Sequence, residues 1–182
     1  MAIELARHSS RKTTPDVQRA MGITVHTGWG ACVVVAGSLE RPEILANLVV
    51  EILGNDERFC FHAASEMKPA AARTWIEHLR EKALITARQA LVPLIAHGVG
   101  VCAIVAKEGN PSDLNEALAS HPRIHTGEGC FYRDVFRDAC GAPVRVIPPT
   151  SLDISRVGKL APPPWGRDQK LAALAAWSRL EK

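Results

Sequence analysis

Small and β-branched residues dominate residues 23–38 (ITVHTGWGACVVVAGS), and Gly28 and Gly30 interrupt the run in its middle. This pattern predicts two strands joined by a tight turn. Residues 43–54 could form a third strand or a short helix, and we favour a strand for part of this segment. The aromatic and apolar residues 58–65 predict a further buried strand.

The clearest helical pattern begins at Lys68-Pro69, because Pro is favoured in the first turn and the residues that follow are mostly strong helix formers. Pro93 is expected to kink or frustrate the last turn, and His97-Gly98 is the predicted stop. The predicted buried stripe of this helix consists of Ile76, Leu79, Ala83, Ala87, Ala90 and Leu94.

The second half of the chain alternates strands with helices. Residues 99–106 are a continuous apolar run, as in a central strand covered on both faces. A helix capped by Ser112 is predicted next, with a break and restart at Pro122, followed by a short strand at 143–149. A proline-rich stretch and an Ala- and Leu-rich helix complete residues 162–182. This order predicts an α/β fold with a mixed sheet, an initial antiparallel meander and helices on both faces.

The length of 182 residues fits one domain that can bury a proper core. Residues 1–20 mix charges with Ser, Thr and Pro and show little period, so we expect a flexible N-terminal arm. Residues 22–182 are predicted to form a single α/β domain.

Composition and charge narrow the functional classes. A formal net charge of +3 is compatible with an anionic ligand but is far from the basic stripe of a dedicated nucleic-acid binder. The five cysteines include no C-x-x-C motif, so we expect buried thiols in a reducing cytoplasm. No apolar run reaches the roughly 18 residues of a membrane span, and a membrane partner is not expected.

The stretch 120–134 (SHPRIHTGEGCFYRD) carries the most candidate chemistry. As a helix it places His121, His125, Glu128 and Tyr132 on one stripe that continues into the buried face. Two imidazoles and a carboxylate on adjacent turns could hold a metal or exchange protons. The alternative is a polar network in which each buried group has a structural partner.

Further candidates lie in other segments. His62 is expected at the end of a strand, where open α/β sheets place ligands, and His26 lies on the first strand. Asp168 and Lys170 lie at the start of the last helix, where free backbone donors favour anions. Trp29 is interpreted as a packing residue, although it could also stack on a base.

Three strands followed by alternating helices and strands resemble the ribonuclease H-like fold. The turn 27-TGWG-30 before an apolar strand is similar to the start of Holliday junction resolvases of that superfamily. The helix 168-DQKLAALAAW-177 is similar to their final helix. The resemblance could cover residues 22–180.

The resemblance implies three or four carboxylates around one or two divalent ions, the first of them an Asp on the first strand. This chain has Val25-His26-Thr27 there and no carboxylate. Asp168 corresponds to the acid of the last helix, and Glu108 is a looser match to the middle one. Some members of the superfamily have lost nuclease activity, so the resemblance leaves enzyme and binding module open.

We therefore expect a hydrolase that acts on a phosphoester or related anionic substrate, or alternatively a non-catalytic module that binds a small anion, a nucleic acid or a protein. The candidate cofactor is one divalent ion, Mg²⁺, Mn²⁺ or Zn²⁺. The candidate catalytic residues are His26, His62, His125, Glu128 and Asp168. The candidate substrate-binding residues are Tyr132, Arg133 and Lys170. The candidate metal ligands are His121, Glu128 and Asp168.

Overall fold

The structure is a computed structural model that describes residues 18–107, 109, 113–158 and 165–180. The strands are β1 (Arg19–His26), β2 (Trp29–Gly37), β3 (Pro42–Glu51), β4 (Val101–Val105) and β5 (Val144–Ile147). The helices are α1 (Cys60–Ser65), α2 (Pro69–Ile95), α3 (Leu114–Leu118), α4 (His121–Ala139) and α5 (Arg167–Trp177), with short 3₁₀ turns η1 (Pro149–Ser151) and η2 (Ile154–Val157). Most of the predicted arm, together with Glu108 and Ser112, lies outside the described residues.

The strands form one sheet in the order β3-β2-β1-β4-β5. The first three strands are antiparallel, whereas β4 and β5 run parallel to β1. The predicted mixed sheet with an initial meander is therefore confirmed, including the strand interpretation of 43–54. The first strand begins at Arg19, three residues before the start predicted for the domain.

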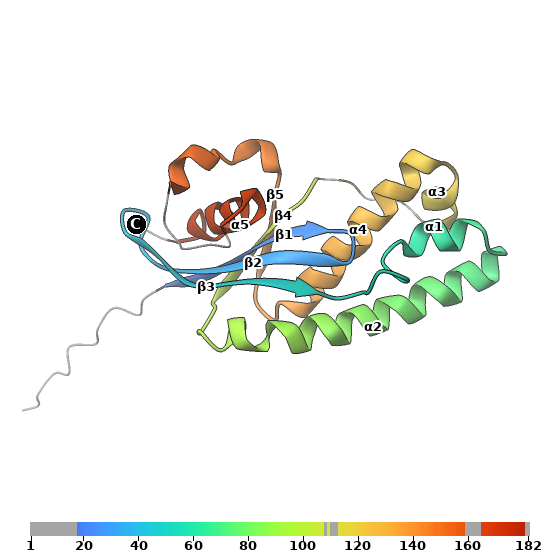
Figure 1. Ribbon diagram of the computed structural model, residues 1–182, viewed down its shortest axis with the longest axis horizontal. Helices are drawn as coiled ribbons and strands as arrows, with labels where there is room; N and C mark the ends of the chain where they lie inside the picture. Colours follow the sequence, from blue (N-terminus) through green and yellow to red (C-terminus); the bar gives the residue numbers. More distant parts are fainter. Residues whose placement is uncertain (1–17, 108, 110–112, 159–164, 181–182) are drawn as a thin grey trace, which may run out of the picture.

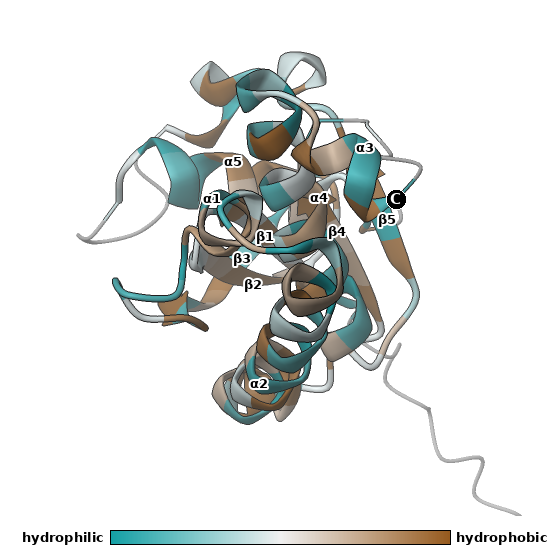
Figure 2. Ribbon diagram, turned by 90° about the vertical axis from the view of Figure 1, so that its right-hand side faces the viewer, coloured by the Kyte–Doolittle hydropathy of each residue, from teal (hydrophilic) through white to brown (hydrophobic). Residues whose placement is uncertain are grey.

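Helices cover both faces of this sheet. In Figure 1, α5 lies on one side of the strands and α2 on the other, and Figure 2 shows the same layers end-on. The alternation of side chains along β2 explains the two layers: Cys32 and Val34 belong to the core with α2 and α4, whereas Val33 and Val35 pack against α5.

The contact between α5 and β1 is unusually close. Gly22 on β1 lies so near α5 that a Cβ atom would overlap the carbonyl oxygen of Ala172. Thr24, two residues further along β1, donates a hydrogen bond to the carbonyl oxygen of Asp168, 2.9 Å away. The first turn of α5 is therefore held against the end of β1.

The long helix is confirmed. Pro93 lies inside α2, two residues before its end, and Gly98 adopts a φ of +78° just beyond it. A left-handed glycine after the last turn is a common helix stop. No described helix is both long enough and apolar enough to span a membrane.

The strand predicted at 58–65 is wrong. Residues 60–65 form helix α1, which packs against α2, α3 and α4 instead of joining the sheet. A short apolar run has no period that separates a buried strand from a buried helix. The helical cap predicted at Ser112 also needs correction, because the Asp113 side chain accepts the hydrogen bond from the Glu116 backbone and caps α3.

Candidate functional site

A pocket of about 500 Å³ opens where β1 and β4 end, between α4 and the start of α5. Ligands of open α/β sheets bind at the carboxyl ends of parallel strands, and β1 and β4 are such a pair. The described residues that line the pocket with polar side chains are Thr24, His26, Lys107, His125, Thr126, Cys130, Arg167 and Asp168.

His26 is fixed on the wall of this pocket by two neighbours. Its Nε2 atom lies 3.1 Å from a carboxylate oxygen of Asp168, and its ring stacks on Trp29 with centroids 4.1 Å apart and planes 8° from parallel. The Nε2 atom is itself buried but not aligned for a hydrogen bond within the described structure, so the contact with Asp168 is an ion pair when the ring is protonated. About a third of each side chain in the pair is exposed, 38% for His26 and 33% for Asp168.

The pocket favours anions. Lys107 and Arg167 are exposed cations on its lining, and Asp168 alone among the described lining residues carries a carboxylate. Arg167 also lies in the first turn of α5, where free backbone N–H groups attract negative charge. Burial raises the pKa of the Cys130 thiol, and its Sγ contacts the carbonyl oxygen of Gly109 at 3.2 Å, so this cysteine remains a neutral thiol at pH 7.

A second histidine–carboxylate pair lies between α1 and α4. His62 Nδ1 and Glu128 Oε1 are 2.9 Å apart, and the His62 backbone N–H donates to the same oxygen at 3.4 Å. The Glu128 residue is only 2% exposed, whereas 31% of the His62 side chain is exposed. A buried carboxylate needs hydrogen-bonding partners, and His62 supplies them.

The His62 ring is also one of three imidazoles in contact. Ring centroids are 4.9 Å apart for His62 and His125, 4.5 Å for His125 and His121, and 5.4 Å for His62 and His121. Ligand nitrogens of the three side chains all lie within 4.8 Å of one another.

Apolar and weakly polar groups surround Glu128 on its inner side. Tyr132, which is 0% exposed, donates its hydroxyl to the carbonyl oxygen of Arg58 and so ties α4 to the segment before α1. Burial, followed by the nearby Glu128 carboxylate, raises the pKa of the Cys60 thiol to about 12. Burial likewise raises the pKa of Tyr132.

The predicted burial of the helical stripe on α4 is confirmed for only two of its four residues. Glu128 and Tyr132 are buried as predicted, whereas His121 and His125 are exposed. The first turns of α4, which carry both histidines, extend beyond the strand ends (Figure 1). His121 and His125 contact His62 of α1 there, and His125 also lines the pocket.

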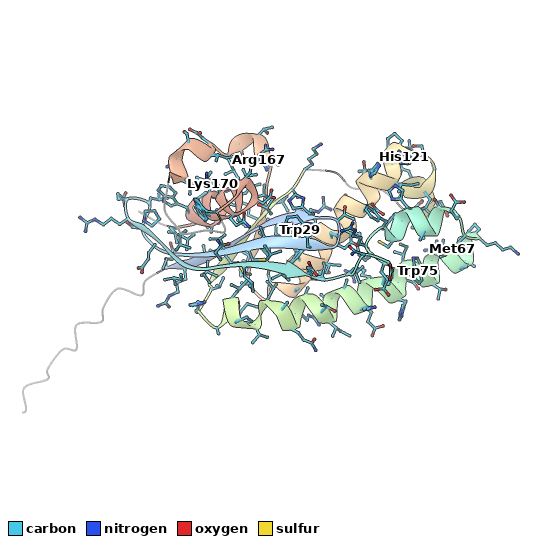
Figure 3. The ribbon with its side chains drawn as sticks, viewed as in Figure 1. Trp29, Met67, Trp75, His121, Arg167 and Lys170 are labelled. Carbon is cyan, nitrogen blue, oxygen red and sulfur yellow. The ribbon has the colours of Figure 1, made fainter. Side chains whose placement is uncertain are left out.

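The predicted substrate-binding residues are not on the pocket lining. The Tyr132 hydroxyl donates to the carbonyl oxygen of Arg58, and its contact with a substrate stays a prediction. Arg133 is buried and donates to Asp134 at 2.9 Å and to the carbonyl oxygen of Gly109 at 2.7 Å, so it links α4 to Gly109. Lys170 lies on α5, one turn beyond Arg167 (Figure 3).

The five predicted catalytic residues form two groups. His26 pairs with Asp168, and His62 pairs with Glu128. His125 lies between them, because it lines the pocket and also contacts the His62 ring. Glu128 and Asp168, which we predicted to share an ion, therefore bind different histidines, and His121 clusters with imidazoles instead of with these acids.

Sequence reasoning did not identify Lys107 as a pocket residue or Trp29 as the support of His26. The second of these had a usable signal. Residues 26 and 29 flank the two-residue turn between β1 and β2, and such flanking residues are direct cross-strand neighbours, as the register of the two strands shows. The position of Lys107 depends on how the chain leaves β4, which no local pattern specifies.

The described lining of this pocket does not fit the one or two divalent ions that the resemblance implies. The end of β1 presents Thr24, Val25 and His26, and the oxygen of Asp168 faces an imidazole. Divalent ions such as Mg²⁺ need several oxygen ligands, which the described lining does not provide.

No family model and no curated protein matches the sequence. Solved structures do match. The Thermus thermophilus RuvC structure in complex with a Holliday junction substrate is similar with a TM-score of 0.51 and 12% identity over 88% of this chain and 91% of that chain. Another Thermus thermophilus RuvC structure gives a TM-score of 0.50 and 10% identity over 88% and 92%. The chain therefore has the ribonuclease H-like fold of these RuvC structures.

Proposed function

We propose that the pocket binds a phosphoester, with a nucleic-acid phosphodiester as the best candidate, and that His26 is the acid–base group for its hydrolysis. The observation that carries this proposal is the fixed position of His26. Its imidazole is held between Trp29 and Asp168 on the wall of a pocket that also carries Lys107 and Arg167.

The proposed reaction is attack of water on phosphorus. His26 accepts a proton from the water as its oxygen bonds to phosphorus, the ester P–O bond breaks, and the leaving oxygen takes a proton from solvent. Asp168 faces Nε2, which leaves Nδ1 as the nitrogen that exchanges the proton. The carboxylate stabilises the imidazolium that forms, as in other histidine–carboxylate pairs.

The two cations have a separate task. Lys107 and Arg167 stabilise the negative charge on the non-bridging oxygens, and this contribution needs no metal ion. The nucleic-acid character of the substrate is supported by the bound Holliday junction in one similar structure.

A binding module without catalysis is the second candidate. The observation that favours it is the single carboxylate among the described residues on the lining, together with Thr24-Val25-His26 where the resemblance implies an acid. In this case the same cations would hold the nucleic-acid backbone, and affinity would fall with added salt.

Hydrolysis of bis(p-nitrophenyl) phosphate and of a labelled branched DNA, both with EDTA present, tests the first proposal. His26→Gln should lower kcat/KM by at least about 100-fold, the usual contribution of one acid–base group. His97→Gln, at an exposed histidine beyond α2, is the matched control and should leave the rate unchanged.

Fluorescence anisotropy with the same DNA separates the two candidates. If the chain binds DNA without cleaving it, and Lys107→Ala and Arg167→Ala each weaken binding, the binding module replaces the hydrolase. If neither hydrolysis nor binding of DNA is detected, both candidates are wrong.

A further inference from the structure

The three imidazoles at the junction of α1 and α4 have the spacing of a loose metal-ligand set. His121 and His125 lie one turn apart on α4, and His62 reaches them from α1. In a tetrahedral zinc site with Zn–N bonds of about 2.0–2.1 Å, ligand nitrogens lie roughly 3.3 Å apart. Here the nitrogens lie within 4.8 Å of one another. Both α4 side chains are exposed, so small rotations can close the set.

Glu128 gives an independent reason to regard this cluster as a site. Its carboxylate is buried, and it accepts from Nδ1 of His62 at 2.9 Å. This contact places the proton of His62 on Nδ1 and leaves Nε2 with a lone pair. A carboxylate behind a histidine is the usual way in which proteins set the tautomer and orientation of a metal ligand.

The backbone fixes the same arrangement. The His62 N–H also donates to Glu128, so the carboxylate binds both the main chain and the ring of one residue. At Gly127, next to Glu128, an added Cβ would lie 2.8 Å from the Phe61 ring. Helices α1 and α4 therefore approach closely at the point where their histidines meet.

The ligand chemistry selects the class of metal. Neutral imidazoles suit zinc and its transition-metal neighbours, whereas Mg²⁺ and Ca²⁺ prefer oxygen. Three protein ligands leave a fourth position open, as in catalytic zinc sites. Because His125 also lines the pocket at the ends of β1 and β4, the three-histidine cluster adjoins that pocket.

We propose that His62, His121 and His125 bind one transition-metal ion of the zinc class and that Glu128 orients His62 for it. This site does not depend on the function proposed for His26. It differs from the carboxylate set implied by the resemblance in its ligands, in its place on α1 and α4, and in the metal that it selects.

Titration of the full chain with Co²⁺ tests the site, because cobalt in a tetrahedral nitrogen set absorbs visible light. We expect one Co²⁺ per chain, displacement by Zn²⁺ but not by Mg²⁺, and a rise in the melting temperature with Zn²⁺. His121→Gln and His125→Gln should each weaken binding by at least about 100-fold, and Glu128→Gln by roughly 10- to 100-fold, the range for an outer partner of a ligand.

His97→Gln is again the matched control and should bind Co²⁺ as the unmodified chain does. The proposed site is wrong if the unmodified chain binds no Co²⁺ at neutral pH. It is also wrong if His121→Gln and His125→Gln bind Co²⁺ as tightly as the unmodified chain does. If only Glu128→Gln has no effect, the orienting role fails and the three-histidine site stands. The titration uses no substrate and the hydrolysis assay contains EDTA, so failure of one proposal is distinguishable from failure of the other.

Discussion

Two histidine–carboxylate pairs in the described part of the chain differ mainly in the burial of the acid. Asp168 is one-third exposed and pairs with His26 on the wall of a pocket. Glu128 is almost fully buried and pairs with His62 between two helices. Water competes for the first pair and weakens it, whereas the second pair has few alternative partners.

This difference separates two uses of the same chemistry. An exposed pair contributes little to stability but can exchange protons with a bound molecule. A buried carboxylate has a fixed partner, so it orients the imidazole and holds the helices together. The burial of the acid therefore indicates whether its histidine can exchange protons with a bound molecule or is held in one orientation.

The sharpest test of this comparison is Glu128→Gln. The amide keeps the shape of the side chain but loses the charge, so the charge-assisted hydrogen bond to His62 is weakened. We expect the free energy of unfolding to fall by about 2 kcal/mol in chemical denaturation, since a hydrogen bond to a charged group contributes about 1.5–3 kcal/mol. Glu57→Gln, which breaks the exposed pair with Lys82, is the control and should cost less than about 1 kcal/mol. Equal losses in the two variants would contradict the comparison.

The Cys60 thiol lies beside the buried Glu128, and it should make the free energy of unfolding depend on pH in the alkaline range. Its pKa is raised from 9.0 to about 12 in the folded chain, so above pH 9 the unfolded chain loses this proton first. Stability from this group is complete below pH 9 and decreases as the pH rises towards 12, by up to about 1.4 kcal/mol per pH unit.

Urea denaturation between pH 8 and pH 10.5 measures this slope. Cys60→Ala should start from a lower stability at pH 8 and then decline less steeply than the unmodified chain. Parallel slopes would mean that the thiol ionises as readily in the folded chain as in the unfolded one.

Trp29→Leu tests the support of the exposed pair. Removing the ring that stacks on His26 should lower the free energy of unfolding by about 1 kcal/mol, the size of a stacked aromatic contact. Trp29→Phe retains a ring and should recover most of this loss. If Trp29→Leu and Trp29→Phe lower the free energy of unfolding equally, stacking on residue 29 does not hold His26.

The smallest expected change in stability comes from Asp168→Asn. Because the pair is partly exposed, the free energy of unfolding should change by less than about 1 kcal/mol. The rate of phosphoester hydrolysis should nevertheless fall by at least about tenfold, since the imidazolium loses its counter-charge. A large loss of stability with an unchanged rate would reverse the roles that we assign to the two pairs.

The fold was predictable where local patterns are long. The Val-rich meander and the helix that starts at Pro69 extend over enough residues for their periods to be distinct. Residues 58–65 are too few and too uniformly apolar for a period, and only tertiary contacts with other helices decide their conformation.

For the candidate site, the sequence predicted the burial of one acid but not which side chains would be partners. Helical spacing on α4 predicted correctly that Glu128 lies on the inner face. It carries no information on which histidine approaches from another element, and the pairing of His62 with Glu128 spans 66 residues. The pairing of His26 with Asp168 likewise depends on how α5 packs against β1.

The packing of α5 against β1 requires Gly22, so this residue affects the width of the pocket between the two elements. Gly22 lies on the same strand as His26, and α5, which carries Asp168 and Arg167, lies directly against it. Substitution of Gly22 by Ala would place a methyl group against the Ala172 carbonyl and force α5 away from β1. The pocket would then widen although no side chain that lines it had changed. The width of the pocket therefore depends on a residue that is not among those that line it.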